Sequence, residues 1–402
     1  MEQENIIGRR IREIRMWRQL SQTALAELAG FSSGYLSRIE SGERRVEKRA
    51  TLEALATALK VAPSELAATP FPPRDDVAAE ARAAVGFVEA VVADIRLGDP
   101  IDMTPRAWPE IAAELNRLNN DLRPRADYAA QGFLLPKLIE ELHAIYNTEA
   151  NHQVDALHGL AACYHAAAML GSNMGVRGIG PLAADRQVTV AERLEHPAWI
   201  AHAAWVRTLM IGGSNRERQA TFVLRSIAEA DRQTLTPELV QALGQLHLAA
   251  ALAYSSVGDE DQAWTHFGEA ETLAAGQEAE VGTFGCMWFG RTNVQIWKVG
   301  LGAEFGYGGK VAELAQGTRP EILRSPVREC VFYADLGRAL AQEKRTRGDA
   351  VRLLRKAEDL APQYIRNKPL IRETVADLMQ RAQHDTVGRE LRGMAYRFGL
   401  AG

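Results

Sequence analysis

The chain has 402 residues, of which 47% are hydrophobic and 24% are charged, and its formal net charge is −4. This length predicts two or three domains, and the ordinary hydrophobic content excludes an intrinsically disordered chain. The acidic balance excludes a polycation that coats nucleic acid along its whole length.

The three cysteines are scattered and lack CxxC spacing. This pattern excludes a disulfide framework and predicts a reducing, cytoplasmic environment. Residues 1–15 are too charged for the apolar core of a signal peptide. The uncharged runs at 156–176 and 239–258 contain His, Gln, Ser or Asn. We therefore expect packed alanine-rich helices there and no contact with a membrane.

Charge and proline divide the chain. Residues 1–68 have 11 basic and 9 acidic residues, whereas the remainder has a net charge of −6. The sequence ATPFPPRDD follows and is typical of a short stiff linker. Beyond it the pattern is helical almost throughout. We predict an all-α protein with a small N-terminal domain (1–68), a Pro-rich linker (69–76) and a large helical domain (77–402).

The N-terminal domain is predicted to contain five helices. An apolar stripe lies on the first helix and consists of Ile6, Ile7, Ile11 and Ile14. Ser21 is a favourable N-cap for a second helix, and Ser32 is one for a third. A fourth helix is expected at about 50–59, and a short fifth one begins at about 63.

The second and third helices have the features of a helix-turn-helix. Ala26 is small where the next helix must cross closely, and Gly30 lies at the turn, where a Cβ would be unfavourable. The positions that seal the two helices onto a shared core are apolar: Leu25, Ala29, Phe31, Leu36 and Ile39.

Residues 5–67 resemble the Cro/cI-like (XRE) family of helix-turn-helix domains. The resemblance rests on the stretches SQTALAELAG, SSGYLSRIESGER and ATLEALATALKVAPSEL. It implies a five-helix, lambda-repressor-like domain whose third helix enters the DNA major groove. Sequence-specific binding to double-stranded DNA is therefore expected.

The resemblance also implies which residues contact DNA. The recognition helix begins at Ser32, and its side chains face the bases or the nearby backbone, while Gln22 binds a phosphate and braces that helix. The full set is Gln22, Ser32, Ser33, Gly34, Ser37, Arg38, Arg44, Arg45 and Lys48, the last three lying in a loop that approaches the backbone.

Two qualifications apply to this interpretation. Arg38 is the only long donor on the recognition helix, so DNA shape and a second half-site are expected to add to specificity. The alternative is a small bundle that has lost DNA binding or binds a protein.

We expect Trp17 in the core or at its boundary.

The large domain contains two segments that resemble tetratricopeptide repeats, at 247–274 and 336–362. In the first, small and bulky residues alternate as a helical hairpin requires: Ala251, Tyr254, Gly258, Ala263, Phe267 and Ala270. Weaker helix pairs are expected at 157–195 and 198–231. Stacked hairpins predict a TPR-like α-superhelix with a concave groove.

An XRE domain followed by such repeats resembles bacterial regulators that sense signalling peptides, which implies a peptide or small-molecule ligand. Inner-face asparagines typically hold the peptide in these receptors. Asn147, Asn151, Asn173, Asn215 and Asn293 are candidates, although each is more typical of a loop or cap. The aromatic, Gly-rich segment 282–310 adds Trp288, Arg291 and Trp297. We favour the alternative that its aromatics fill core gaps left by glycine.

No motif indicates an enzyme. The phosphate-loop and dinucleotide patterns fail, and neither HExxH nor GxSxG occurs. We expect no metal and no cofactor. The sequence predicts a cytoplasmic, nucleoid-associated transcription regulator that acts as a homodimer on inverted-repeat operators. The alternative is a TPR protein-interaction scaffold in which DNA binding is secondary.

Overall fold

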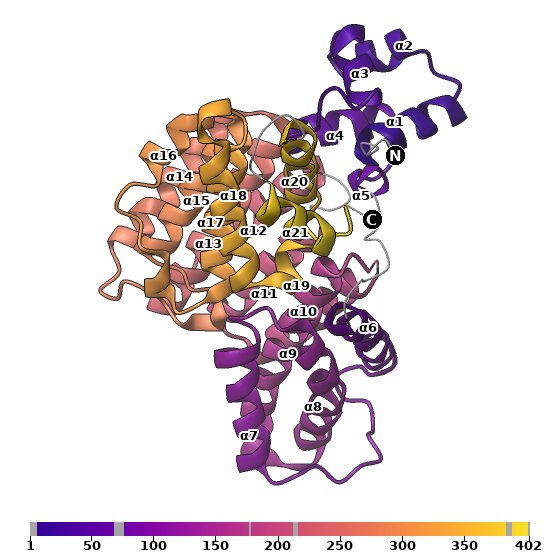
Figure 1. Cartoon of the computed structure of the whole chain (residues 1–402). Helices are drawn as coiled ribbons and strands as arrows, with labels where there is room; N and C mark the ends of the chain where they lie inside the picture. Colours follow the sequence, from indigo (N-terminus) through magenta and orange to yellow (C-terminus); the bar gives the residue numbers. More distant parts are fainter. Residues whose placement is uncertain (1–5, 68–75, 177, 212–215, 383–387, 401–402) are drawn as a thin grey trace.

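The structure of the protein is a computed structural model that describes residues 6–67, 76–176, 178–211, 216–382 and 388–400 (Figure 1). Every regular element in these ranges is a helix, which confirms the all-α prediction. Within the same ranges, no helix combines the length and the apolar character needed to cross a membrane.

Residues 6–67, called the head below, contain the five predicted helices. They are α1 (Ile6–Trp17), α2 (Gln22–Leu28), α3 (Ser33–Glu40), α4 (Arg49–Ala58) and α5 (Pro63–Leu66). The Ser21 hydroxyl accepts a hydrogen bond from the Ala24 amide at 3.0 Å, and Ser32 caps α3 through the Tyr35 amide at 3.2 Å. Gly30 has a φ of +74°, so the turn between α2 and α3 requires the left-handed conformation that glycine permits.

The head has its own hydrophobic core. Its buried residues include Leu25, Ala26, Leu36 and Ile39, together with Ile7, Ile11 and Ile14 of α1. Trp17 is 77% exposed, so our expectation that it lies in the core or at its boundary is wrong. Trp17 is the last residue of α1, and it extends past the core with Arg18 5.5 Å from its ring centroid.

The predicted linker lies outside the described residues except for Asp76, the first residue of α6. The body, residues 76–400, begins there. Its α-helices are α6 (Asp76–Asp94), α7 (Trp108–Arg117), α8 (Tyr128–Thr148), α9 (Gln153–Asn173), α10 (Ile179–Leu194), α11 (Pro197–Ile211), α12 (Arg216–Ala230), α13 (Pro237–Val257), α14 (Glu260–Ala275), α15 (Arg291–Phe305), α16 (Val311–Leu314), α17 (Pro326–Leu340), α18 (Arg347–Leu360), α19 (Pro362–Ile365), α20 (Pro369–Ala382) and α21 (Arg389–Arg397).

Helices α13 and α14 form the hairpin predicted at 247–274. Gly258 ends α13 with a φ of +82°, and the Asp259 carboxylate then accepts a hydrogen bond from the Gln262 amide at the start of α14. Ala251, Ala263 and Phe267 are buried where the two helices meet. Small residues at the crossing thus allow the close helix packing that the repeat pattern predicts.

The second predicted repeat corresponds to α17 and α18, whose Ala350, Leu354 and Ala357 are buried. The weaker predicted pairs correspond to α9 with α10 and to α11 with α12. Consecutive helices therefore pack in pairs along most of the body.

The aromatic segment contributes to the core. The ring of Phe289 is fully buried against Gly244 of α13, where an added Cβ would lie 2.0 Å from the ring. This contact agrees with our preferred interpretation, in which an aromatic side chain fills the space left by a glycine.

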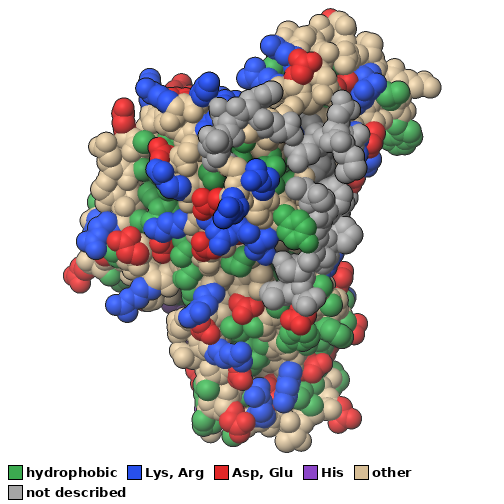
Figure 2. Space-filling view, in the orientation of Figure 1, with side chains coloured by type: hydrophobic (Ala, Val, Ile, Leu, Met, Phe, Trp, Pro, Cys, Tyr) green, Lys and Arg blue, Asp and Glu red, His purple; other side chains and the backbone are tan. Residues whose placement is uncertain are grey.

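The head lies at one end of the body, with α4 and α5 nearest to it and with α2 and α3 on the far side (Figure 1). Helix α4 contacts α13 of the body. Figure 2 shows Lys and Arg side chains near the middle of one face of the body, with Asp and Glu side chains between them. Because α3 is on the far side of the head in Figure 1, the recognition helix predicted from the sequence lies away from the body.

Candidate DNA-binding surface and inter-domain cavity

Helix α3 presents a polar surface. Ser32, Ser33, Gly34 and Arg38 are exposed and Ser37 is half-buried. A Cβ built at Gly34 meets no atom within 4 Å, so this part of the helix has open space before it. The Arg38 guanidinium donates to the Gly34 carbonyl at 3.3 Å and so lies along the same surface. The structure thus brings together the five residues that we predicted on the recognition helix.

Glu40 fixes the position of α3 in the head. Its carboxylate is buried and accepts hydrogen bonds from the Arg15 Nε at 2.7 Å and from the Gln22 Nε2 at 2.8 Å. The hydrogen bond to Glu40 raises the pKa of Arg15 above its ordinary value. Gln22 is therefore connected to α3 through Glu40, and its contact with a DNA phosphate stays a prediction.

The loop after α3 differs from expectation. Arg44 is exposed and lies 4.7 Å from the Tyr35 ring centroid. Arg45 is only 3% exposed, and its guanidinium lies 3.6 Å from the Glu373 carboxylate and donates to Gln380 at 3.2 Å.

Lys48 likewise donates to the Phe305 carbonyl at 2.8 Å. We expected Arg45 and Lys48 to approach the DNA backbone. In this structure both contact the body, because the head is docked with this loop against α15 and α20.

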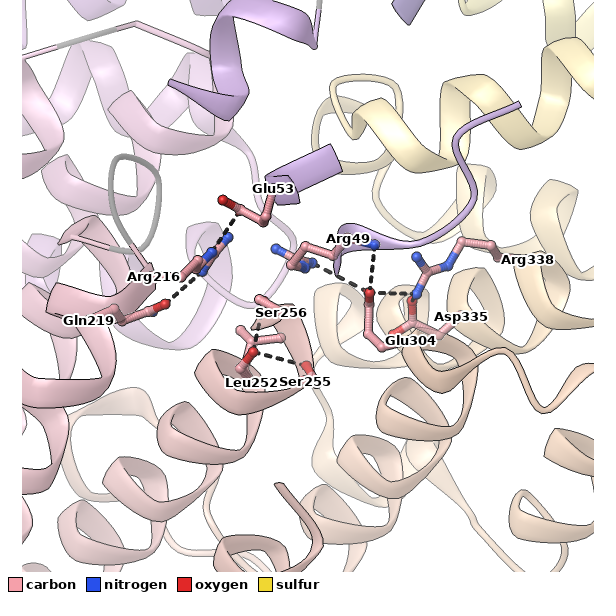
Figure 3. A network of polar contacts seen from close by, with 10 residues as sticks. All are labelled: Arg49, Glu53, Arg216, Gln219, Leu252, Ser255, Ser256, Glu304, Asp335 and Arg338. Carbon is pink, nitrogen blue, oxygen red and sulfur yellow. Dashed lines mark hydrogen bonds and ion pairs between the residues drawn. The ribbon is translucent and has the colours of Figure 1, made fainter. Parts of the chain in front are cut away.

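A polar network joins α4 to the body (Figure 3). The Arg49 amide donates to Glu304 of α15 at 3.2 Å, and Arg338 of α17 donates to the same carboxylate at 2.8 Å. On the other side, Arg216 of α12 donates to Glu53 at 2.8 Å. The head is therefore held by charged hydrogen bonds at several points.

The electrostatics of this network follow from burial and from neighbouring charge. Burial alone would raise the pKa of Glu304, but Arg338 and Arg49 outweigh it and lower the pKa to about 2. Burial raises the pKa of Asp335, although Arg338 opposes this effect. Glu304 is thus charged at neutral pH and neutralises two arginines, one from each domain.

A cavity of about 690 Å³ lies at this junction. Its lining includes Arg49, Leu52 and Glu53 from α4 and residues of α15, α17 and α20. This volume is in the range of sites for small molecules and cofactors.

The predicted ligand residues divide into two groups. Trp297 lines the cavity, and the Asn293 Oδ1 accepts a hydrogen bond from Arg328, another lining residue, at 2.9 Å. Arg291 pairs with Glu280 at 2.8 Å and does not line the cavity. Trp288 does not line the cavity and packs against the hydrophobic cluster that contains Ile296.

Among the other asparagines, Asn173 lines the cavity and accepts a hydrogen bond from Lys368 at 2.6 Å. The Asn147 side chain donates to the Asp99 carbonyl, and Asn151 is exposed. Asn215 lies outside the described residues. Within the described ranges, no three His, Cys, Asp or Glu residues are grouped so that they could hold a metal ion.

The basic lining residues were not predicted from the sequence as ligand-binding residues; they are Arg49, Arg216, Arg328, Arg338 and Lys368. They come from three helices and one loop, and no local spacing connects them. Each one alone resembles an ordinary surface charge, so only the packing of the helices reveals them as a group.

Comparison with known protein families gives a match for residues 6–69 to the model described as "Helix-turn-helix domain". The described part of this range, residues 6–67, forms a helix-turn-helix domain. The result agrees with the geometry of α2 and α3, with Gly30 at their turn.

Two relatives from Bacillus subtilis (strain 168) match this helix-turn-helix domain. They are described as the uncharacterized HTH-type transcriptional regulator RghRB and the HTH-type transcriptional repressor RghR. Each is 44% identical over 54 residues, which is 13% of this chain and 39% and 40% of the respective relatives. The matched region thus spans about two fifths of the length of these relatives.

A comparison of structures finds a likeness to Bacillus thuringiensis PlcR in complex with the peptide PapR7 and DNA. The match covers 68% of this chain and 95% of that chain, with 16% identity and a TM-score of 0.25. A score this low does not define how the helices of the body are arranged.

Proposed function

We propose that the protein is a sequence-specific DNA-binding regulator of transcription and not an enzyme. The observation that carries this proposal is the exposed polar surface of α3 in a helix-turn-helix domain. Helix-turn-helix proteins place this second helix of the motif in the major groove.

The chemistry of the α3 surface supports this role. Arg38 can donate two hydrogen bonds to a guanine edge, and the serine hydroxyls can donate or accept at base edges. Open space at Gly34 lets a base edge or a phosphate approach the helix backbone. Arg44 adds positive charge beside this surface, and such charge supplies salt-dependent affinity for phosphates.

The regulator acts in the cytoplasm, associated with the nucleoid, as a homodimer on inverted repeats. Two-fold symmetry then places the half-site centres about 34 Å apart, or a multiple of this distance. The body is the better candidate for the dimer surface because the head is small and already has a closed core.

The body senses a peptide or small-molecule signal and controls where the heads lie. The docking contacts of Arg45, Lys48 and Arg49 support this mechanism, because they link the head to two helices of the body, α20 and α15. A ligand that favours one head position over another changes DNA affinity by shifting that equilibrium.

Selection from a pool of random DNA duplexes tests the proposal. Full-length protein should enrich one motif with two related half-sites, and light scattering of the complex should give two chains per duplex. A pool that shows no enriched motif after repeated rounds would contradict sequence-specific binding and favour a scaffold.

A further inference from the structure

The inter-domain cavity has more positive than negative charge. Among the described residues, five basic side chains line it (Arg49, Arg216, Arg328, Arg338 and Lys368), and three acidic ones do (Glu53, Glu304 and Asp335). The acidic side chains are already engaged. Glu304 contacts Arg49 and Arg338, Asp335 contacts Arg338, and Glu53 contacts Arg216.

Within the part of the chain that the structure describes, Arg328 and Lys368 are therefore left without a carboxylate partner. Among the described residues, no Asp or Glu oxygen lies within ion-pair distance of either cation. Lys368 donates to the Asn173 amide oxygen and lies 4.1 Å from the ring centroid of Tyr364. The Arg328 Nε donates to Asn293, while its Nη2 is buried without a hydrogen-bond partner in the described structure.

Such uncompensated charge is costly inside a protein. Burial lowers the pKa of Arg328, and it lowers that of Lys368 to about 8. An anion placed between these cations would neutralise both and would accept the hydrogen bond that Arg328 leaves unmade.

Apolar side chains in the walls of the cavity indicate that the ligand also has an apolar portion. Trp297, Ile296, Leu301 and Val331 are among the lining residues. The Arg328 guanidinium lies 5.6 Å from the centroid of the Trp297 ring, so a flat apolar surface adjoins the cationic end. A ligand that suits both parts has an anionic group and an apolar portion.

We propose that the inter-domain cavity binds a small organic anion whose carboxylate or phosphate group pairs with Arg328 and Lys368, with its apolar part against Trp297. Because α4 forms part of the wall through Arg49 and Leu52, the bound anion contacts both domains. Its influence on DNA rests on the proposed function, whereas its binding does not.

Calorimetric titration of the full-length protein without DNA tests this proposal. The probes are 1-naphthoate, 1-naphthyl phosphate and the neutral 1-naphthalenemethanol, which share one ring system. At least one anion should bind with one site per chain and at least tenfold more tightly than the alcohol. The tighter of the two anions then identifies the favoured headgroup. Equal affinity of the alcohol and both anions would overturn the proposal.

Variants show whether binding occurs at this cavity. Arg328→Gln and Lys368→Met should each weaken binding of the tighter anion at least tenfold, while Arg328→Lys should keep most of it. Lys356→Met is the matched control, because Lys356 lies 3.9 Å from the Tyr333 ring centroid but does not line the cavity. It should bind the anion as the unmodified protein does.

If a folded Lys368→Met protein bound the anion with unchanged affinity, the assignment of the anion site to the inter-domain cavity would be overturned, even if Arg328→Gln failed to fold. Motif selection from random DNA is measured without these probes. A failure of anion binding is therefore distinguishable from a failure of the proposed regulator function.

Discussion

The Arg45 guanidinium of the head lies 3.6 Å from the carboxylate of Glu373 on α20 of the body. Burial raises the pKa of Glu373, and the charge of Arg45 opposes this effect. The contact removes from solvent a cation that follows the recognition helix. The docked head thus leaves α3 exposed, whereas Arg45 and Lys48 contact the body.

Weakening this docking should strengthen the electrostatic part of DNA binding. In the double variant Glu304→Gln/Glu373→Gln, the head loses its ionic contacts with α15 and α20, so Arg45 and Lys48 can reach phosphates. Each new phosphate contact changes the slope of log K against log[salt] by about −0.9, so the slope should become steeper by about 1.8. Fluorescence anisotropy of a labelled duplex at several salt concentrations measures this slope.

The control for this experiment is Glu313→Gln/Glu321→Gln. It neutralises two exposed carboxylates of the body and so changes the net charge of the protein by the same amount. Its slope should match that of the unmodified protein. Identical slopes for both double variants would show that docking does not restrict the loop cations.

The Arg15 and Glu40 pair should contribute strongly to the stability of the head. Arg15→Met leaves the buried Glu40 carboxylate with Gln22 as its remaining side-chain donor. Removing one partner of a buried ion pair costs about 3–5 kcal/mol, and the partial exposure of Arg15 places the expected loss at the lower end of this range. Thermal unfolding measures it, with the exposed Arg12→Met as control. Equal losses in both variants would contradict the bracing role of Glu40.

A buried histidine should make the body sensitive to acid. The His202 Nε2 donates to the Gly285 carbonyl at 3.2 Å, and its Nδ1 accepts from the Gln187 amide at 3.0 Å. This arrangement requires the neutral ring. Burial, together with the charge of Arg123, lowers the pKa of His202 to about 3.

The unfolded chain binds a proton at His202 below about pH 6.5, whereas the folded chain does not. The contribution of neutral His202 to the free energy of unfolding is therefore fully present above this pH, and it is lost as the pH decreases toward 3. Between pH 7.5 and 5.5, His202 should lower the free energy of unfolding by about 1.4 kcal/mol. Urea unfolding of the unmodified protein and of His202→Gln at both pH values measures this contribution. The same pH dependence in both proteins would exclude it.

The sequence predicted the head better than the body, for a physical reason. Capping by Ser21 and Ser32, the turn at Gly30 and the small Ala26 are local requirements, so a short stretch of sequence reveals them. The Arg49 contact with Glu304 and the cavity next to it depend on residues far apart in the chain. Arg45 was assigned to DNA because its position in the motif is informative, whereas its partner Glu373 lies in a helix with no pattern that connects it to the head.

Two glycines test how closely the aromatic segment packs. Gly244→Ala would place a Cβ 2.0 Å from the ring of Phe289, and overpacking of this kind costs about 1–3 kcal/mol. Gly268→Ala on α14 meets no atom within 4 Å and should be neutral or stabilising by up to about 1 kcal/mol. Chemical denaturation should give a lower free energy of unfolding for Gly244→Ala than for Gly268→Ala. A stable Gly244→Ala protein would contradict the buried position of Phe289.

Sequence-specific recognition through α3 is measured by the ratio of the protein's affinities for a selected duplex and for a random duplex. At physiological salt this ratio should be at least about 10³ for the unmodified protein. Arg38→Ala should weaken binding to the selected duplex by about 1–3 kcal/mol. Gln22→Ala should also weaken this binding, and neither variant should lose helical content. The same change at Arg319, an exposed arginine of the body, should leave the ratio unchanged. A ratio near one, or a ratio that Arg38→Ala and Gln22→Ala both leave intact, would contradict the account.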